Sequence, residues 1–178
     1  MSDEEGEHGF WDLVSEVSEA SSFAWEEEEA EEEGGLTVLS FRVGEDLYCV
    51  EGSAVREVLG EAVMTTLPGA PEYLPGITML RRQAVGLLAL ERFLERGDGE
   101  ERDWGQARIL VVETAHYVVG LLVDEVTGLE TWPERALGTL PENLNARTRR
   151  FARGGREVGE SLRVLLDLEE LLDEAALR

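Results

Sequence analysis

The stretch that decides the fold runs from residue 75 to residue 94 and reads PGITMLRRQAVGLLALERFL. It begins with a Pro-Gly turn and a short apolar run, and it continues through two arginines into a second apolar run and a helical stub. The second run predicts a buried strand, formed by Val85, Leu87, Leu88 and Leu90. Arg81 and Arg82 therefore occupy a turn between two core elements, where Gly, Asn or Asp is more usual. In a chain this acidic, two arginines at such a turn indicate that positive charge has a specific role at this position and does not merely serve solubility.

Short β-like runs separated by turn signals continue on both sides of this stretch. Residues 36–43 alternate apolar and polar, residues 44–46 turn and residues 47–50 return, which predicts a hairpin. Ser53 is expected to cap a helical turn over residues 54–56. Further strands are predicted at residues 57–59, 62–67, 107–112, 117–123, 126–132 and 161–166. Nine or ten short strands with few helices indicate an all-β barrel or sandwich rather than a doubly wound sheet.

Four other positions have clear local patterns. Residues 95–105 are polar and predict an exposed loop, whereas residues 151–155 end in two glycines and predict a turn. Pro133 is expected to open a short turn. Asp167 precedes the leucine-rich residues 168–177 and predicts a capped C-terminal helix.

The 178-residue chain has a net charge of −23, and this charge is concentrated at the N-terminus. Residues 1–35 contain 14 Asp and Glu residues and no Lys or Arg, which leaves 25 acidic and 16 basic residues in the remainder. An acidic body argues against nucleic acid as a partner, because nucleic-acid binders need a basic face. One basic cluster is expected to pair with local carboxylates or with an acidic partner: Arg147, Arg149, Arg150, Arg153 and Arg156.

We divide the chain into an acidic, largely disordered tail, residues 1–35, and one domain, residues 36–178. Apolar residues of the tail fall at helical spacing, and the central ones are Phe10, Trp11, Leu13 and Val14. Residues 26–33 form a glutamate block that should stay solvated. The amphipathic segment is either a helix that docks on its own domain or merely frays, or a linear motif that docks in a groove of a partner. Its acidic flanks argue against an anionic membrane surface.

Residues with catalytic or metal-binding chemistry are sparse in this sequence. It contains no nucleophile elbow, phosphate-binding loop, dinucleotide fingerprint or zinc signature. His8 and His116 cannot form a structural zinc site with the single Cys49, which reads as a buried, inert thiol. Glu113 and Asp124 could be imagined as a catalytic carboxylate pair, but such pairs arise by chance among 39 acidic residues. We therefore expect no enzyme, no cofactor and no metal.

The sequence also bears on where the protein resides. It has no run of 18 apolar residues and no basic start followed by an apolar region. Its single cysteine excludes an internal disulfide. These features predict a soluble, cytoplasmic protein without direct membrane insertion.

Four stretches in the same order resemble the CheW-like domains of bacterial chemosensory adaptors, over roughly residues 36–175. The first comprises LSFRVGEDLYCV from Leu39 and VREVL from Val55. The second is similar to the family pattern P-x-x-(I/L)-x-G-(V/I)-x-N-L-R-G through Pro71, Leu74, Pro75-Gly76 and Leu80-Arg81. The third, VVGLLVDEV from residue 118, is similar to (V/I)-G-(L/I)-x-V-D-x-V. The fourth, LRVLLDLEELL from residue 162, is similar to the closing strand and terminal helix of the family.

This resemblance implies an all-β fold of two intertwined five-stranded SH3-like barrels with short helices and a C-terminal helix. It implies no cofactor, no catalysis, and a cytoplasmic scaffold recruited to chemosensory arrays. The implied partners are a CheA-type histidine kinase, bound by one subdomain, and the cytoplasmic tip of a chemoreceptor, received by a groove between subdomains. Four residues match positions of the interface with these partners: Val55, Glu57, Leu80 and Arg81. We predict that Glu57 holds the guanidinium of Arg81 in a fixed orientation, the alternative being a purely structural ion pair.

The chain departs from the family pattern at four positions. Met79 and Arg82 stand where the family usually has Asn and Gly, and Gly86 and Ala89 stand where Pro and Asp are common. A left-handed conformation at Arg82 is expected to cost about 1 kcal/mol. The leading hypothesis is a non-enzymatic adaptor that couples a chemoreceptor to a CheA-type kinase. The alternatives are a divergent adaptor that localises or inhibits a signalling complex without bridging the two, and a small enzyme that uses Glu113, Asp124 or His116.

Overall fold

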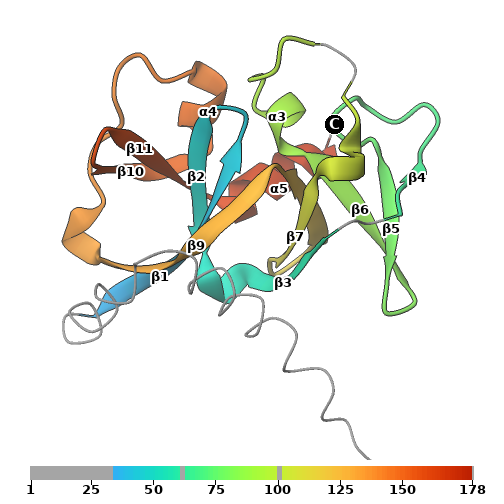
Figure 1. The fold of residues 1–178 in the computed structure, drawn as a ribbon, viewed down its shortest axis with the longest axis horizontal. Helices are drawn as coiled ribbons and strands as arrows, with labels where there is room; N and C mark the ends of the chain where they lie inside the picture. Colours follow the sequence, from blue (N-terminus) through green and yellow to red (C-terminus); the bar gives the residue numbers. More distant parts are fainter. Residues whose placement is uncertain (1–33, 61–62, 100–101, 178) are drawn as a thin grey trace, which may run out of the picture.

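The computed structural model describes residues 34–60, 63–99 and 102–177, which form two β-sheets. Figure 1 shows the sheets side by side, with helix α5 (Leu168–Leu177) behind the centre of the molecule. Strands dominate and the helices are short, so the predicted all-β fold class is confirmed. The predicted docking residues Phe10, Trp11, Leu13 and Val14 lie outside the described residues.

The first sheet is built from both ends of the described chain. Its strands lie in the order β10-β11-β2-β1-β9. They are β1 (Gly35–Val43), β2 (Asp46–Glu51), β9 (Glu125–Pro133), β10 (Ala152–Val158) and β11 (Ser161–Leu166). Strand β11 pairs with β2 in parallel, and the other neighbours are antiparallel. Because the chain leaves this sheet after β2 and returns at β9, the second sheet is inserted within the first, which is the intertwined arrangement expected.

The second sheet comes from the middle of the chain. Its strands lie in the order β3-β7-β8-β6-β5-β4, and β6 and β8 pair in parallel. They are β3 (Val55–Leu59), β4 (Thr65–Thr66), β5 (Gly76–Leu80), β6 (Gln83–Ala89), β7 (Arg108–Glu113) and β8 (Val118–Val123). The sheet has six strands because the two-residue β4 pairs with the edge of β5.

Short helical segments connect the strands. They are η1 (Gly52–Ala54), α3 (Leu90–Phe93), η2 (Trp104–Gln106), η3 (Glu134–Ala136) and α4 (Ala146–Arg150). Pro133 precedes η3, as predicted. The carboxylate of Asp167 accepts a hydrogen bond from the backbone N–H of Glu170 at 3.1 Å, so the predicted cap of α5 is confirmed.

Three apolar cores explain why the central strands read as continuous apolar runs. The largest core lies between the two sheets and includes Phe41, Leu88, Leu110 and Leu171. A second core, with Leu87 and Ile109, covers the other face of the second sheet. A third, around Trp132 and Cys49, covers the other face of the first sheet. Successive residues such as Leu87 and Leu88 therefore enter different cores, and both faces of the strand are buried.

Two local sequence predictions were wrong. Ser53 does not cap a helical turn over residues 54–56: it lies inside η1, no side chain caps that turn, and β3 already begins at Val55. Residues 151–155 do not form a turn, because β10 starts at residue 152. Gly154 is needed for packing, since a Cβ atom there would lie 2.6 Å from the Leu137 side chain.

Candidate protein-interaction surfaces

The turn between β5 and β6 carries the two arginines that the sequence singles out. Leu80 pairs with Gln83, so Arg81 and Arg82 are the only two residues of this hairpin loop. Their φ angles are 46° and 69°, and positive φ at both central residues is the pattern of a type I′ turn. This turn matches the right-handed twist of the strands, but it normally takes Asn and Gly.

Glu57 and Arg81 lie together at this end of the second sheet. The Glu57 carboxylate is 3.9 Å from the guanidinium of Arg81, and the two side chains are 21% and 69% exposed. A bulge in β3 shifts the register between Val55 and Glu57, so that Glu57 lies opposite Val111 on β7. A bulge commonly re-aims a side chain in this way. The structure thus forms the ion pair that the sequence predicted and leaves most of the Arg81 side chain in solvent.

The other two predicted interface residues are half-buried and face different cores. Val55 packs against the core between the sheets, whereas Leu80 packs against the second core. They hold the backbone on either side of the ion pair rather than forming one continuous contact patch with it.

Two exposed apolar side chains beside the hairpin were not identified as site residues from the sequence. Met79 is 64% exposed and Val63 is 88% exposed. The hydroxyl of Thr78 donates a hydrogen bond to the backbone carbonyl of Val63 at 3.0 Å, which holds the two segments side by side. The sequence signal that could have identified Met79 is the alternation along β5, in which Thr78 is buried and Met79 is exposed.

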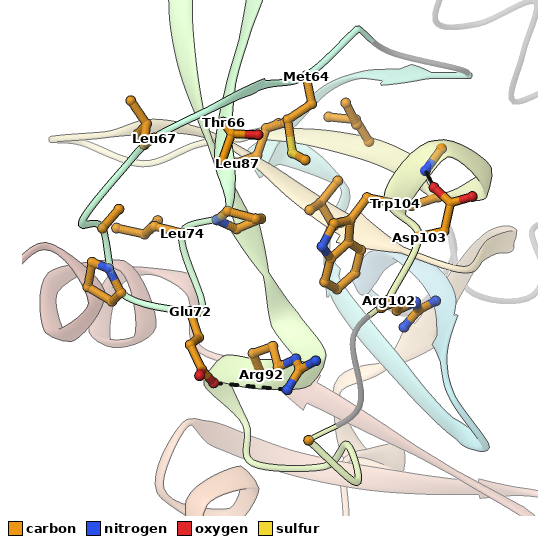
Figure 2. A pocket seen from close by; sticks show the side chains of 18 residues that line it. Met64, Thr66, Leu67, Glu72, Leu74, Leu87, Arg92, Arg102, Asp103 and Trp104 are labelled. Atoms are coloured by element: carbon orange, nitrogen blue, oxygen red, sulfur yellow. Dashed lines mark hydrogen bonds and ion pairs between the residues drawn. The ribbon is translucent and has the colours of Figure 1, made fainter.

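A groove of about 1050 Å³ opens on the second core (Figure 2). Its apolar lining includes Met64, Leu87, Trp104, Ile109 and Leu122. Figure 2 shows Trp104 facing Leu74 and Leu67 across the opening. We call it the second-sheet groove. The sequence did not predict it, because its walls come from four separate stretches of the chain, the last of them represented by Leu122.

Charged residues at the edge of the second-sheet groove are mostly paired. Arg92 and Glu72 form an ion pair at 4.0 Å, drawn in Figure 2. The guanidinium of Arg102 pairs with the carboxylates of Glu91 and Asp124 and lies 4.9 Å from the ring centre of Trp104. The edge is therefore close to neutral while the interior is apolar.

A smaller cavity of about 270 Å³ lies between the two sheets. Its walls come from the end of β2, from η1, from the turn after β7 and from the start of α5. Glu113, one of its lining residues, forms a two-pronged ion pair with Arg56, at 2.5 and 2.7 Å. Because η1 leads directly into Val55, this inter-sheet cavity adjoins one predicted interface residue.

The structure does not bring the candidate catalytic residues together. Glu113 pairs with Val118 at one end of the β7–β8 hairpin, whereas Asp124 follows Val123 at the other end. Asp124 accepts a hydrogen bond from the backbone N–H of Gly44 at 2.6 Å, and His116 is an exposed turn residue. Within the described residues no group of His, Cys, Asp and Glu could hold a metal ion.

Cys49 is an inert, buried thiol, as predicted from the sequence. It is fully buried, and Ser40 lies within hydrogen-bond distance of its sulfur, at 3.1 Å. Burial raises the pKa of the Cys49 thiol to about 11, although Ser40 and the nearby Arg163 lower it. The reactive thiolate is therefore absent near neutral pH.

A family model described as "CheW-like domain" matches residues 37–176. The chain belongs to the CheW-like family. It is 30% identical over 142 residues to "Probable chemotaxis protein CheW" of Rhizobium etli, which covers 80% of this chain and 90% of the relative. It is 31% identical over 138 residues to "Chemotaxis protein CheW" of Rhizobium meliloti, which covers 78% and 88%. "Protein FrzA" of Myxococcus xanthus is 38% identical over 93 residues, covering 52% of this chain and 57% of the relative.

Among solved structures, the CheW-like fold is matched by "scaffolding protein TtCheW" from Thermoanaerobacter tengcongensis. The TM-score is 0.66 at 23% identity, over 77% of this chain and 92% of that one. This likeness bears on the fold alone and supports two SH3-like barrels. No helix in the described part of this CheW-like chain is long and apolar enough to cross a membrane.

Most arginines of the basic cluster in this CheW-like chain interact with other residues of the same chain. Arg147 and Arg150 pair with Glu174 at 2.9 and 2.5 Å, and Arg153 pairs with Glu51. Arg149 donates a hydrogen bond to the backbone carbonyl of Pro141, and Arg156 lies over the ring of Trp132. Pairing with local groups was one of the two outcomes expected from the sequence, and it leaves no continuous basic face in this cluster.

Proposed function

We propose that this protein is a non-catalytic adaptor that couples the cytoplasmic tip of a chemoreceptor to a CheA-type histidine kinase. The observation that carries the proposal is the ion pair of Glu57 with Arg81 at the end of the β5–β6 hairpin. Membership of the CheW-like family supports the signalling context. The location that goes with this proposal is the cytoplasm, at a chemosensory array.

The receptor binds at the end of the molecule that carries Arg81. The half-buried Glu57 carboxylate attracts the exposed Arg81 guanidinium by its charge, and at 3.9 Å it leaves the guanidinium N–H groups free to donate to a partner. Glu57 is the less exposed member of the pair, so it acts as the support and Arg81 as the contact. Val55 and the adjoining inter-sheet cavity extend this surface toward the junction of the two sheets.

The kinase binds at the second-sheet groove. A bridging adaptor needs two separate surfaces, and this groove faces away from the first sheet. Its apolar interior and near-neutral edge suit an apolar segment of a folded partner, whose burial would drive association. Leu80 connects the two surfaces, because it packs in the second core while its neighbour Arg81 contacts the receptor.

Replacement of Arg81 tests the receptor side. Arg81→Ala should lower the affinity for the cytoplasmic receptor fragments encoded in the same genome by about tenfold or more, since it removes charge-assisted hydrogen bonds. Arg42→Ala is the control, because Arg42 is another partly exposed arginine in an ion pair, with Glu125 at 3.3 Å, but on strand β1 of the first sheet. Equal affinities of the two variants, with both proteins folded, would remove Arg81 from the interface.

A second candidate is an adaptor that localises or inhibits a signalling complex without bridging its parts. It is favoured by Met79 and Arg82, which depart from the family pattern in the hairpin itself. Deletion of residues 1–33 separates the two functions. A localising adaptor loses its cellular position and keeps kinase contact, whereas a bridging adaptor keeps both.

A further inference from the structure

In the described two-residue hairpin turns of this protein, the residues with positive φ angles are glycine in two turns and arginine in another. In the β1–β2 turn, between the paired residues Val43 and Asp46, the positive φ of 61° falls on Gly44. In the β10–β11 turn, the positive φ of 63° falls on Gly159. Only the β5–β6 turn places positive φ on side-chain-bearing residues, and it does so twice, at Arg81 and Arg82.

A left-handed conformation is unfavourable for arginine, because its Cβ atom crowds the backbone. Strain of this kind persists where the surroundings enforce it, and it is concentrated at functional sites. Arg81 has a structural partner in Glu57 that can help to hold it. Arg82 is exposed, and among the described residues it makes no ion pair or hydrogen bond. The fold itself therefore gains nothing visible from arginine at position 82.

We propose that Arg82 is a partner-contacting residue that, with Met79, determines which receptor this adaptor binds. The inference rests on the proposed function and adds a specificity determinant to it. The left-handed backbone at both turn residues presents two guanidinium groups from one tight hairpin tip. Arg81 is oriented from within the protein by Glu57, while Arg82 is left to be oriented by the partner.

The chemistry of the tip specifies the partner segment. A guanidinium offers a planar fork of donors that matches a carboxylate. Met79 lies on the adjoining strand with 64% of its surface exposed, and its flexible thioether side chain adapts to apolar partners. The receptor segment that fits therefore presents an Asp or Glu side chain next to an apolar one, on its cytoplasmic tip.

Replacement of Arg82 by glycine separates a role in binding from a role in folding. Arg82→Gly relieves the backbone strain, so the thermal unfolding midpoint should rise by about 2–4 °C. The affinity for the receptor fragment that the unmodified protein binds should fall by about tenfold. Arg82→Asn tolerates the left-handed region without the added flexibility of glycine, and it should weaken binding equally.

Glu95→Gly is the matched control, because Glu95 is also an exposed non-glycine residue with positive φ, at 54°. It follows α3, which lies at the other end of β6 from the β5–β6 turn (Figure 1). Its midpoint should rise in the same way while receptor affinity stays unchanged.

The outcomes are distinguishable. If the unmodified protein binds receptor and Arg82→Gly binds equally well, the inference is overturned and the proposed function stands. A lower midpoint for Arg82→Gly would also overturn it, since Arg82 would then serve its own fold. If the unmodified protein binds no receptor fragment of its genome, the proposed function fails and the inference fails with it.

Discussion

Glu130 and Arg163, both on strands of the first sheet, form a buried ion pair, in which their side chains are 4% and 10% exposed. The two residues come from β9 and β11, strands that are not neighbours in the sheet. The indole N–H of Trp132 donates a hydrogen bond to the same carboxylate at 2.9 Å. The charge of Arg163 is thus balanced by a buried group that is held by a core tryptophan.

Breaking this ion pair should strongly destabilise the fold. Glu130→Gln retains an oxygen for Trp132 but leaves the Arg163 charge uncompensated, which typically costs about 3–5 kcal/mol when a buried pair loses one member. Urea unfolding monitored by tryptophan fluorescence measures the loss. Glu125→Gln is the control, because Glu125 pairs with Arg42 in solvent and should change stability by less than about 1 kcal/mol. Similar stabilities of the two variants would contradict the structural role given to Glu130.

Alkaline pH should destabilise the protein through two buried acidic groups. Burial raises the pKa of Cys49 to about 11, and burial next to Asp46 raises that of Tyr48 to about 12. Each group stays protonated in the folded state at a pH where the unfolded chain loses the proton. Their stabilising effect is therefore complete below about pH 9 and is lost as the pH rises to about 12. Urea midpoints between pH 8 and 11 should fall for the unmodified protein, and they should fall less for Cys49→Ala.

The space around Gly120 should not accept a methyl group. A Cβ atom on this residue of β8 would lie 2.7 Å from side-chain atoms of both Ile109 and Leu87. Gly120→Ala should therefore cost about 1–3 kcal/mol through overpacking of the second core. Gly86→Ala is the matched control in the neighbouring strand β6, because nothing lies within 4 Å of the added atom. Calorimetry should find a lowered midpoint only for the Gly120 variant, and equal midpoints would mean that the core relaxes freely.

Charge introduced at the second-sheet groove should weaken kinase binding. Leu67 lines the groove and is partly exposed, so Leu67→Glu places a carboxylate where an apolar partner segment would be buried. We expect a loss of affinity of at least tenfold for the CheA-type kinase, with little change in stability. Val63→Glu alters an exposed apolar residue that does not line the groove and should bind normally. Normal binding by Leu67→Glu would show that the kinase binds at another surface.

The sequence predicts the parts of this fold in which local pattern and packing agree. The strand at residues 107–112 was predicted because both of its faces are buried, so its residues form one apolar run. The cap at Asp167 was predicted because a helix N-terminus needs an acceptor for its free N–H groups. The turn at Arg81 and Arg82 was predicted from its place between two apolar runs, although its φ angles were not.

Other parts depend on contacts between distant segments. The two glycines at residues 154 and 155 predict a turn from sequence. In the structure, glycine is required at position 154 because the Leu137 side chain packs against it. The Glu57–Arg81 ion pair was predicted from a family resemblance rather than from spacing, because 24 positions of sequence separate the two residues. The second-sheet groove could not be predicted, since it forms only when four separate stretches of the chain, some in loops and some in strands, come together around Leu87.

We propose that one molecule of this protein contacts receptor and kinase at two different surfaces. The most direct measurement is retention of the purified CheA-type kinase on immobilised receptor fragments, with and without this protein. We expect strong retention of the kinase only when the unmodified protein is present. Arg81→Ala should abolish retention while still binding the kinase alone, and Leu67→Glu should abolish retention while still binding the receptor alone. Retention that is independent of this protein, or loss of both contacts in either folded variant, would contradict the bridging function.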